Sequence, residues 1–564
     1  ASLPEALVDR AAELGYPAVA LLDRNGVHGA PRFHKAALAA GIRPIVGVEL
    51  TIDSGQWAAG GDQRTAGSGQ RAADHQHFAT SCQLPAASPS VSRPSTVVRC
   101  QLPAAGFRLP VLIESREGYQ NLCRLLTRMN LRSPKGEGAL TLDELDGHTA
   151  GMVALVGREA LHGGRHGVGG LVDRLVGLFG RSNVYLELQR QLVRDEESDN
   201  QALIALASAF HVPVVATGGV RFAAPEDRPL YDVLTCIRHK TTLEAAGRKL
   251  ALNAERFLKP REQMAELFRD IPEAVAGTAA LADRLRYTMA DLGYRFPDYP
   301  VPAGETMASF LRKVTEVGAR ERYRPYHDRA RAQIARELDL IEKLALPGYF
   351  LIVWDIVNFC RQQGILVQGR GSAANSAVCY SLGITAVDPV GMDLLFERFL
   401  SEERGEWPDI DLDLPSGDRR ERVIQHVYEK YGQHGAAMTA NVITYRGRSA
   451  AREVGKVLGI EADQIDRMAK VMPHFHWLPS DGDGTLAAHL EAVGVDAAPP
   501  RMRLFAELWQ RIQDLPRHLG QHSGGMVICR GRLDGVVPLE NASMPGRVVV
   551  QWDKDDCADM GIVK

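Results

Sequence analysis

Short apolar runs alternate with amphipathic stretches along the first 280 residues of the chain. The apolar runs have the length of buried strands, and several of the stretches between them have the spacing of helices. Alternating strands and helices imply parallel strands, as in a β/α barrel or an open α/β sheet. Ser2 and Glu5 form a capping-box pattern before a helix that ends near Gly15. The expected strands are residues 18–22, 44–50, 111–114, 152–156, 184–188 and 212–216.

Residues 53–106 interrupt this pattern. They are rich in Gly, Ser, Ala, Gln and Pro, and show neither a helical nor a strand period. The string CQLPAA occurs at 82–87 and again at 100–105, but two copies of six residues build no solenoid. Because this composition cannot bury enough apolar surface to offset the entropy of ordering, we expect a disordered insert and assign it no function.

The second half of the chain is more helical. Proline and tyrosine punctuate residues 297–326, which indicates a domain junction. Amphipathic patterns predict helices over residues 329–346, 349–361 and 418–431. Residues 515–528, which include His518, Gln521 and His522, lack a helical pattern, and we interpret them as a loop.

Composition places the chain among ordinary soluble proteins. Its 564 residues exceed one core, so about three or four domains are expected. With 45% hydrophobic residues and a net charge of −3, any nucleic-acid surface must be local. The eight cysteines form no C-x-x-C pair, which argues against a zinc site or a disulfide scaffold. No apolar run approaches the length of a membrane span, and no signal peptide is visible, so we expect a cytoplasmic protein without membrane partners.

An acidic segment is the first candidate for chemistry. Asp409, Asp411 and Asp413 alternate with apolar residues, and in a strand they share one face at roughly 6.6 Å spacing. Carboxylates placed in this way can bracket two divalent cations about 4 Å apart. A calcium loop also begins D-x-D-x-D, but its required Gly and Glu are Leu414 and Arg420 here. A solvated acidic strand without function is the remaining alternative.

A Gly-rich turn precedes this segment by some 40 residues. Gly369 and Gly371 let backbone N–H groups approach a ligand, and Ser372 can cap the Ala-rich helical run that follows. A helix N-terminus beside such a turn favours phosphate. The P-loop pattern is absent, and such a turn alone is more often only a turn. Together, the turn and the acid strand predict nucleotidyl transfer.

A basic stripe follows within residues 441–458. Arg448, Arg452 and Lys456 are spaced four apart, which places them on one helical face, and Arg446 lies just before them. Such a stripe suits the phosphate backbone of a duplex. A solvated helix face explains the same residues equally well.

The combination of Gly371-Ser372 with Asp409-x-Asp411 resembles the active site of polymerase-beta-like nucleotidyltransferases. Longer strings resemble bacterial C-family DNA polymerases, and their wording is nearest the error-prone paralogue of the DNA polymerase III alpha subunit. This resemblance covers nearly the whole chain except about residues 53–106. The strings are PGYFLIVWDIV, GRGSAANSAVCYSLGIT, DLLFERFLSEERGEWPDIDLDL and NVITYRGRSAAREVGKVLG.

The resemblance implies an α/β multidomain fold. A PHP-like β/α barrel (residues 1–280) would be followed by a polymerase-beta-like nucleotidyltransferase palm with the acid strand (281–440). A mostly helical thumb (441–518) and a continuation of the palm (519–564) would complete it. The family's opening His-x-His motif would precede Ala1, and its third catalytic aspartate would lie two residues after Lys564. We therefore expect the N-terminal portion of such a polymerase.

Many related barrels bind metals, but most ligand positions differ here. The family's Asp-His pair falls on Asp23-Arg24, its Asp-x-His falls on Gly219-Val220-Arg221, and only Glu49 keeps a ligating side chain. A guanidinium has no lone pair for a metal. We interpret the barrel as a scaffold, which disfavours a barrel phosphoesterase.

The resemblance also implies roles for individual residues. Asp409 and Asp411 would be catalytic and would hold two Mg²⁺ ions, with Asp413 as support. The nucleotide-binding residues would be Arg370, Gly371, Ser372, Arg398, Lys554 and Lys564. The DNA-binding residues would be Arg446, Arg448, Arg452 and Lys456. C-family relatives often have lysine where Gln521 stands, so no nucleotide contact is assigned to Gln521.

The implied reaction is template-directed addition of deoxynucleotides to a primer 3′ end, of the error-prone, damage-tolerant type. The implied partners are primer–template DNA and deoxynucleoside triphosphates, and, through regions beyond this chain, a sliding clamp and accessory mutagenesis proteins. The alternative is a non-catalytic DNA-binding or scaffold fragment of such a polymerase.

Overall fold

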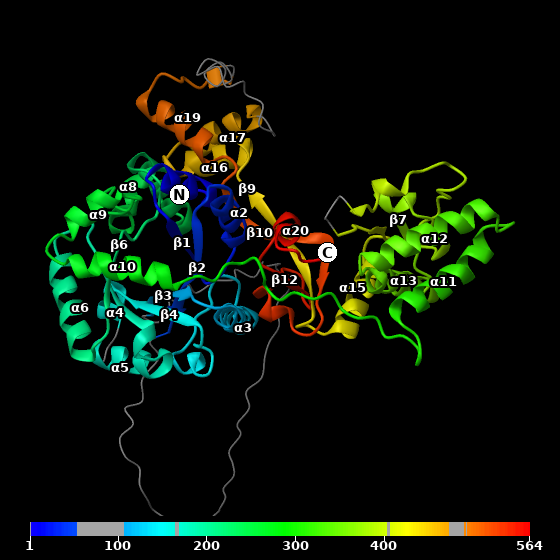
Figure 1. Ribbon diagram of the computed structural model, residues 1–564. Coiled ribbons are helices and arrows are strands. Elements are labelled where there is room, and N and C mark those ends of the chain that lie inside the picture. The colour runs from blue at the N-terminus through cyan, green and yellow to red at the C-terminus, as the bar shows by residue number, and fades with distance from the viewer. Residues whose placement is uncertain (1, 54–105, 164–167, 403–406, 473–489, 492) are drawn as a thin grey trace, which may run out of the picture.

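The computed structural model describes residues 2–53, 106–163, 168–402, 407–472, 490–491 and 493–564. The predicted insert at 53–106 therefore lies outside the described residues, apart from its two end positions. One sheet and its helices form one side of the molecule, a helical unit lies at the other side, and a second sheet lies between them (Figure 1). None of the described helices combines the length and the apolar character that crossing a membrane would require.

The first sheet contains the six strands that the apolar runs predict. They pair in chain order and curl into a half-barrel (Figure 1). β1–β2, β4–β5 and β5–β6 are parallel, as expected, but β3 is antiparallel to both of its neighbours. The prediction of parallel strands is wrong for β3, which is followed by α3; this helix packs mainly against the C-terminal part of the chain, as an antiparallel connection to β4 permits. The strands are β1 (Ala18–Arg24), β2 (Arg43–Ile52), β3 (Phe107–Ile113), β4 (Met152–Val156), β5 (Val184–Gln189) and β6 (Val214–Thr217).

Helices surround this sheet (Figure 1). The first begins after Leu3, which has no side-chain cap, and Ser2 instead donates a hydrogen bond to Asp227 (3.0 Å). The predicted Ser2–Glu5 capping box is therefore wrong, because a long-range partner takes the hydroxyl. The helices are α1 (Pro4–Glu13), α2 (Ala30–Ala39), α3 (Arg116–Arg132), α4 (Arg158–Gly163), α5 (Val168–Phe179), α6 (Glu196–Phe210), α7 (Arg228–His239), α8 (Leu243–Ala246), α9 (Arg261–Leu267) and α10 (Pro272–Arg284).

The helical unit holds the Gly-rich turn and the acid segment. Two of its helices match the amphipathic patterns, whereas the expected junction at 297–326 also contains the helix α11. α11 was missed because its buried positions Leu311, Thr315 and Ala319 include few large apolar side chains. The elements are α11 (Met307–Arg322), α12 (Asp328–Lys343), α13 (Pro347–Gln362), α14 (Ala377–Ser381), the short 3₁₀ helices η5 (Gly371–Asn375) and η6 (Phe396–Arg398), and the two-stranded sheet β7 (Gln368–Arg370) and β8 (Asp411–Asp413).

The second sheet has the strand order β10-β9-β12-β11. β10 covers the stretch that we interpreted as a loop, and this interpretation is wrong. A register shift between Gln521 and Met526, in a glycine-rich stretch, obscures the strand alternation. The elements are α15 (Asp418–Tyr431), β9 (Ala436–Thr444), β10 (Pro516–Ile528), β11 (Leu539–Asn541), β12 (Val548–Val550) and α20 (Lys554–Asp559).

In the described part of the connection between the paired strands β9 and β10 lie the helices α16 (Gly447–Val457), α17 (Ala462–Val471) and α19 (Pro500–Ile512). The predicted domain boundary after residue 440 falls inside β9, and the predicted boundary after residue 518 falls inside β10. The helices therefore form an insertion between two strands of one sheet, and they bury their own apolar cluster together with α7. The predicted domain boundaries stay predictions.

One apolar core joins the two sheets. It contains β2–β5 side chains together with residues of β9, β10 and β12. The indole N–H of Trp552, which is fully buried, donates to the carbonyl of Val27 (2.9 Å), and the Val27 N–H donates to Gln551 (2.9 Å). Segments near the two ends of the chain are thus packed into one structure.

Candidate active site

The acid segment has the alternation that its sequence predicts. Asp409, Asp411 and Asp413 are exposed, whereas Ile410 and Leu412 pack against the core of the helical unit. Only residues 411–413 form a strand, and they pair with β7 so that Asp411 lies opposite Arg370. The three carboxylates are therefore presented on the surface by a short, anchored segment.

Two cations lie against these carboxylates. Lys564 Nζ is 3.4 Å from Asp409 Oδ2, and Arg370 Nε is 2.9 Å from Asp413 Oδ1. Lys564 comes from the far end of the sequence, so the fold brings together two predicted site residues that sequence spacing does not relate. Asp409, Arg370 and Asp413 are more than half exposed, which leaves these pairs open to solvent and to a ligand.

The hydroxyl of Tyr349 contacts the acid segment, although Tyr349 was not predicted as a site residue. Its hydroxyl accepts a hydrogen bond from the Ile410 N–H (3.1 Å). Burial raises the pKa of Tyr349, and the charges of Asp409 and Asp411 raise it further. The neutral phenol fixes the backbone between the two candidate catalytic residues. The only signal in the sequence was its place in the string PGYFLIVWDIV.

The Gly-rich turn differs from its prediction in one respect. Gly371 has φ +70° and open space where a side chain would begin, so its backbone is accessible. Ser372, however, caps no helix. Ser376 caps α14, accepting from the Cys379 N–H (3.0 Å).

A buried carboxylate occupies the N-terminus of α14. Glu337 accepts hydrogen bonds from Ser376 Oγ (2.8 Å) and from the N–H groups of Ala377 and Val378 (both 3.0 Å). Burial raises the pKa of Glu337, and it outweighs these hydrogen bonds, which lower the pKa. The N–H groups at the start of α14 are therefore taken by a side chain from α12, whereas nucleotide binding by Gly371 and Ser372 stays a prediction.

The two other predicted nucleotide-binding cations, Arg398 and Lys554, lie on other elements than the acid segment. Arg398 ends η6 and is exposed, and η6 contacts η5 beside the turn. Lys554 begins α20 and is more than half exposed, with Nζ 4.0 Å from Asp555. Among the described contacts, Lys554 is not paired with the acid segment.

The basic stripe lies on one exposed face of α16, as predicted. Arg448, Arg452 and Lys456 are exposed, while the opposite face is buried among the helices of the insertion. Arg446, at the N-cap, pairs with Asp514, and Arg452 lies 3.5 Å from Asp466. Acidic neighbours thus offset part of the charge of the stripe.

The donor set of the acid segment fits magnesium in kind. Mg²⁺ prefers oxygen ligands and is bound by one or two carboxylates together with substrate phosphates. Asp409 and Asp411 offer two exposed carboxylates. Nowhere in the described part of the chain do three or more His, Cys, Asp or Glu side chains gather as a metal site.

The ligand positions of the half-barrel do not fit a metal. Glu49, its one retained ligand, pairs with Arg221 (2.9 Å) and with Arg108 (3.4 Å). Asp23 accepts from the Gly29 N–H (2.6 Å), and burial raises its pKa. Guanidinium groups thus occupy the positions where a metal ion would need ligands with lone pairs.

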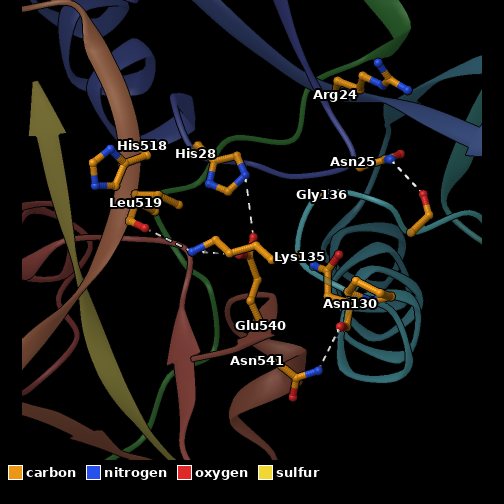
Figure 2. Close-up of a pocket in the computed structure, with 12 residues that line it drawn as sticks. Arg24, Asn25, His28, Asn130, Lys135, Gly136, His518, Leu519, Glu540 and Asn541 are labelled. Atoms are coloured by element: carbon orange, nitrogen blue, oxygen red, sulfur yellow. Dashed lines mark hydrogen bonds and ion pairs between the residues drawn. The ribbon is translucent and has the colours of Figure 1, made fainter. Parts of the chain in front are cut away.

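A pocket of about 310 Å³ lies where the first sheet meets the C-terminal part of the chain (Figure 2). Lys135 Nζ donates to the Leu519 carbonyl (3.0 Å) and lies 3.9 Å from Glu540, which is 3.7 Å from His28. Figure 2 shows Arg24 at the margin of this pocket, on the opposite side of the view from His518. These contacts join the two parts of the molecule.

Two family models match separate parts of the chain. Residues 1–191 match the PHP domain, and residues 309–564 match the bacterial DNA polymerase III alpha NTPase domain. Proteins named error-prone DNA polymerase match the whole chain: 39% identity over 651 residues in Anaeromyxobacter sp. (52% of that protein), 41% over 579 in Mycobacterium tuberculosis (47%) and 40% over 584 in Nocardia farcinica (49%). The chain spans about half the length of the curated relatives that it matches.

Proposed function

This chain, with its PHP domain and its DNA polymerase III alpha NTPase domain, belongs to the bacterial error-prone DNA polymerases related to the polymerase III alpha subunit, and we propose that it carries the nucleotidyl-transfer site of such an enzyme. The reaction would add a deoxynucleotide to a primer 3′ end and release pyrophosphate. The observation that supports this most directly is the exposed pair Asp409 and Asp411, with Lys564 and Arg370 beside them.

Asp409 and Asp411 would hold two Mg²⁺ ions. When bound, the ions supply activation of the primer 3′-hydroxyl and charge compensation for the leaving pyrophosphate. The buried Tyr349 hydroxyl keeps the Ile410 backbone in place, so the two carboxylates are oriented before substrate arrives.

Side chains would neutralise the triphosphate. The donors at the N-terminus of α14 are taken by Glu337, so binding would depend on the accessible Gly371–Ser372 backbone and on four cations. Arg370 and Lys564 lie at the acid segment, where they can stabilise the negative charge that develops on the leaving pyrophosphate. Arg398 and Lys554 would approach from η6 and α20, and complete the set.

Primer–template DNA would contact the exposed face of α16. In this assignment residues 281–440 and 519–564 form the palm, and residues 441–518 form the thumb. The names of the relatives support error-prone synthesis. Damage tolerance, a cytoplasmic location, and a sliding clamp and accessory mutagenesis proteins as further partners are part of the proposal that follows from the family resemblance.

The test is single-nucleotide primer extension with Mg²⁺ by the protein and its Asp411→Asn variant. We expect the variant to lose about 10³-fold or more in extension rate, because a side chain that acts directly in the reaction is removed. Binding of the same primer–template should persist, because Asp411 lies outside the basic face of α16.

Asp413→Asn is the matched control, since Asp413 lies on the same exposed face of β8 but pairs with Arg370. It should retain most of the extension rate. Unchanged extension by Asp411→Asn would contradict the assignment of the catalytic pair.

A further inference from the structure

A buried side chain of α12 holds the chain at the point where the Gly-rich turn ends. Glu337 is fully buried, and each of its carboxylate oxygens accepts two hydrogen bonds. Oε1 accepts from the Ala377 N–H (3.0 Å) and from Gln333 Nε2 (2.9 Å). Oε2 accepts from Ser376 Oγ (2.8 Å) and from the Val378 N–H (3.0 Å). Three of these four donors come from the N-cap and the first two residues of α14.

The Gly-rich turn lies directly before this helix end. η5 covers Gly371–Asn375, and the N–H of the next residue, Ser376, donates to the carbonyl of Ala373 (3.1 Å). The buried side chain of Asn375 donates to the carbonyl of Ser372 (2.9 Å). The backbone of Ser372 is therefore tied to the segment that α12 holds in place.

The other end of the turn is joined to the acid segment. Arg370, which precedes the turn, lies opposite Asp411 in the pairing of β7 with β8. The Gly369 N–H donates to the carbonyl of Ile384 (2.7 Å), and a Cβ at Gly369 would lie 2.7 Å from the same oxygen. The turn thus runs from a closely packed strand, paired with the acid segment, to a helix end that Glu337 holds.

We propose that Glu337 is a positioning residue for the incoming nucleotide and acts through the Gly-rich turn, holding the Gly371–Ser372 backbone in place relative to Asp409 and Asp411. This inference rests on the proposed function, since that function assigns the triphosphate to this backbone. A turn that is fixed before substrate arrives loses less conformational entropy on binding than one that must first be ordered. Glu337 would therefore strengthen nucleotide binding from beneath the surface.

A carboxylate suits this position better than an amide. A carboxylate offers acceptor sites on both oxygens, whereas glutamine has one oxygen and one NH₂ group, which only donates. The NH₂ group of a glutamine would face the Ala377 N–H in one orientation and the Val378 N–H in the other. Either way, a buried N–H at the start of α14 loses its acceptor. Glu337→Gln should therefore loosen this helix end at nearly constant side-chain volume.

The test is single-nucleotide primer extension over a range of nucleotide concentrations by the wild type and Glu337→Gln. We expect the KM for the deoxynucleoside triphosphate to rise about 10-fold or more with little change in kcat, the kinetic sign of lost uniform binding. Affinity for primer–template should stay the same, because the basic face of α16 is unaltered. Glu342→Gln is the matched control, because Glu342 lies on the same helix but is exposed and pairs with Arg312 (2.9 Å).

A second variant and a second measurement separate positioning from misfolding. Ser376→Ala keeps Glu337 and removes one of its links to α14, so the KM should rise several-fold while primer–template binding persists. Hydrogen exchange at residues 371–378 should become faster in Glu337→Gln. Asp411→Asn should lose extension but keep the wild-type exchange there.

The two proposals can therefore fail separately. Absence of extension by the wild type would contradict the proposed function, whereas faster exchange in Glu337→Gln would still support the hold of Glu337 on the turn. Extension by the wild type with an unchanged KM in Glu337→Gln, or unchanged exchange at residues 371–378 in that variant, would overturn the role of Glu337.

Discussion

At the scale of single residues, two aspartates differ in their exposure to solvent. Asp409 is exposed beside Lys564, whereas Asp556 is only 5% exposed on α20. Burial, with the nearby charge of Asp553, raises the pKa of Asp556 to about 7. Near neutral pH the Asp556 side chain is therefore only partly ionised, and it accepts from the Asp553 N–H in the capping box of α20 (3.4 Å).

Asp556 should make stability depend on pH. Its pKa rises from the ordinary 3.8 to about 7 on folding, so its contribution is full below pH 3.8 and is lost as the pH rises through 7. This loss is about 4 kcal/mol, since each unit of pKa difference corresponds to about 1.4 kcal/mol. Asp556→Asn should therefore unfold at higher denaturant concentration than the wild type at pH 8, with little difference at pH 4.

Denaturant unfolding at several pH values measures this effect. Asp555→Asn is the control, because Asp555 is exposed at the preceding position and should keep the wild-type slope of stability against pH. The same slope in Asp556→Asn would contradict the assigned environment.

At the scale of elements, α16 shows how one helix can have two roles. Ala450, Ala451 and Val454 are buried, and they anchor the helix in the insertion between β9 and β10. Its other face carries Arg448 and Arg452 into solvent. A basic face held by a packed helix is a rigid surface for phosphates.

Replacing Arg448 and Arg452 together by Gln should weaken duplex binding for all sequences alike. The slope of log affinity against log salt should decrease by about 2, one for each phosphate that the variant no longer neutralises. Fluorescence anisotropy at several salt concentrations measures both quantities. Arg174→Gln serves as control, because Arg174 pairs with Asp143 on the surface of α5. A loss confined to particular sequences would argue against binding through the DNA backbone.

At the scale of the whole molecule, the first sheet and the C-terminal sheet share one core. Trp552 and Gln551 hold the Val27 backbone, and Thr127 Oγ1 accepts from the Leu539 N–H (3.0 Å). Hydrogen bonds of this kind join residues near the two ends of the chain. The half-barrel therefore packs directly against the C-terminal sheet.

Trp552→Ala should destabilise the protein by about 3–5 kcal/mol, because it removes a fully buried ring and its hydrogen bond. Hydrogen exchange should increase together in the β1–α2 connection and in β12. Trp407→Ala is the control, since Trp407 is 43% exposed, and it should have a much smaller effect. Faster exchange in β12 alone would show that the two sheets are not coupled.

Much of the local structure could be predicted from the sequence. The six strands of the first sheet, α12, α13 and α15, and the exposed face of α16 follow from periodic patterns, which depend on neighbouring residues only. The failures have longer-range causes. β3 runs against its expected direction and is followed by a helix that packs mainly against the C-terminal part of the chain, whereas β10 was missed because a register shift breaks its alternation.

The sequence by itself determined the family and the exposed aspartates of the acid segment, because motifs and alternation are properties of adjacent residues. Only the tertiary structure decided which groups meet those aspartates: Lys564 reaches Asp409 from the C-terminal end. It also placed Glu337 at the N-terminus of α14, and it paired Glu49 with Arg108 and Arg221. Such contacts depend on how distant segments pack, and no local pattern records that.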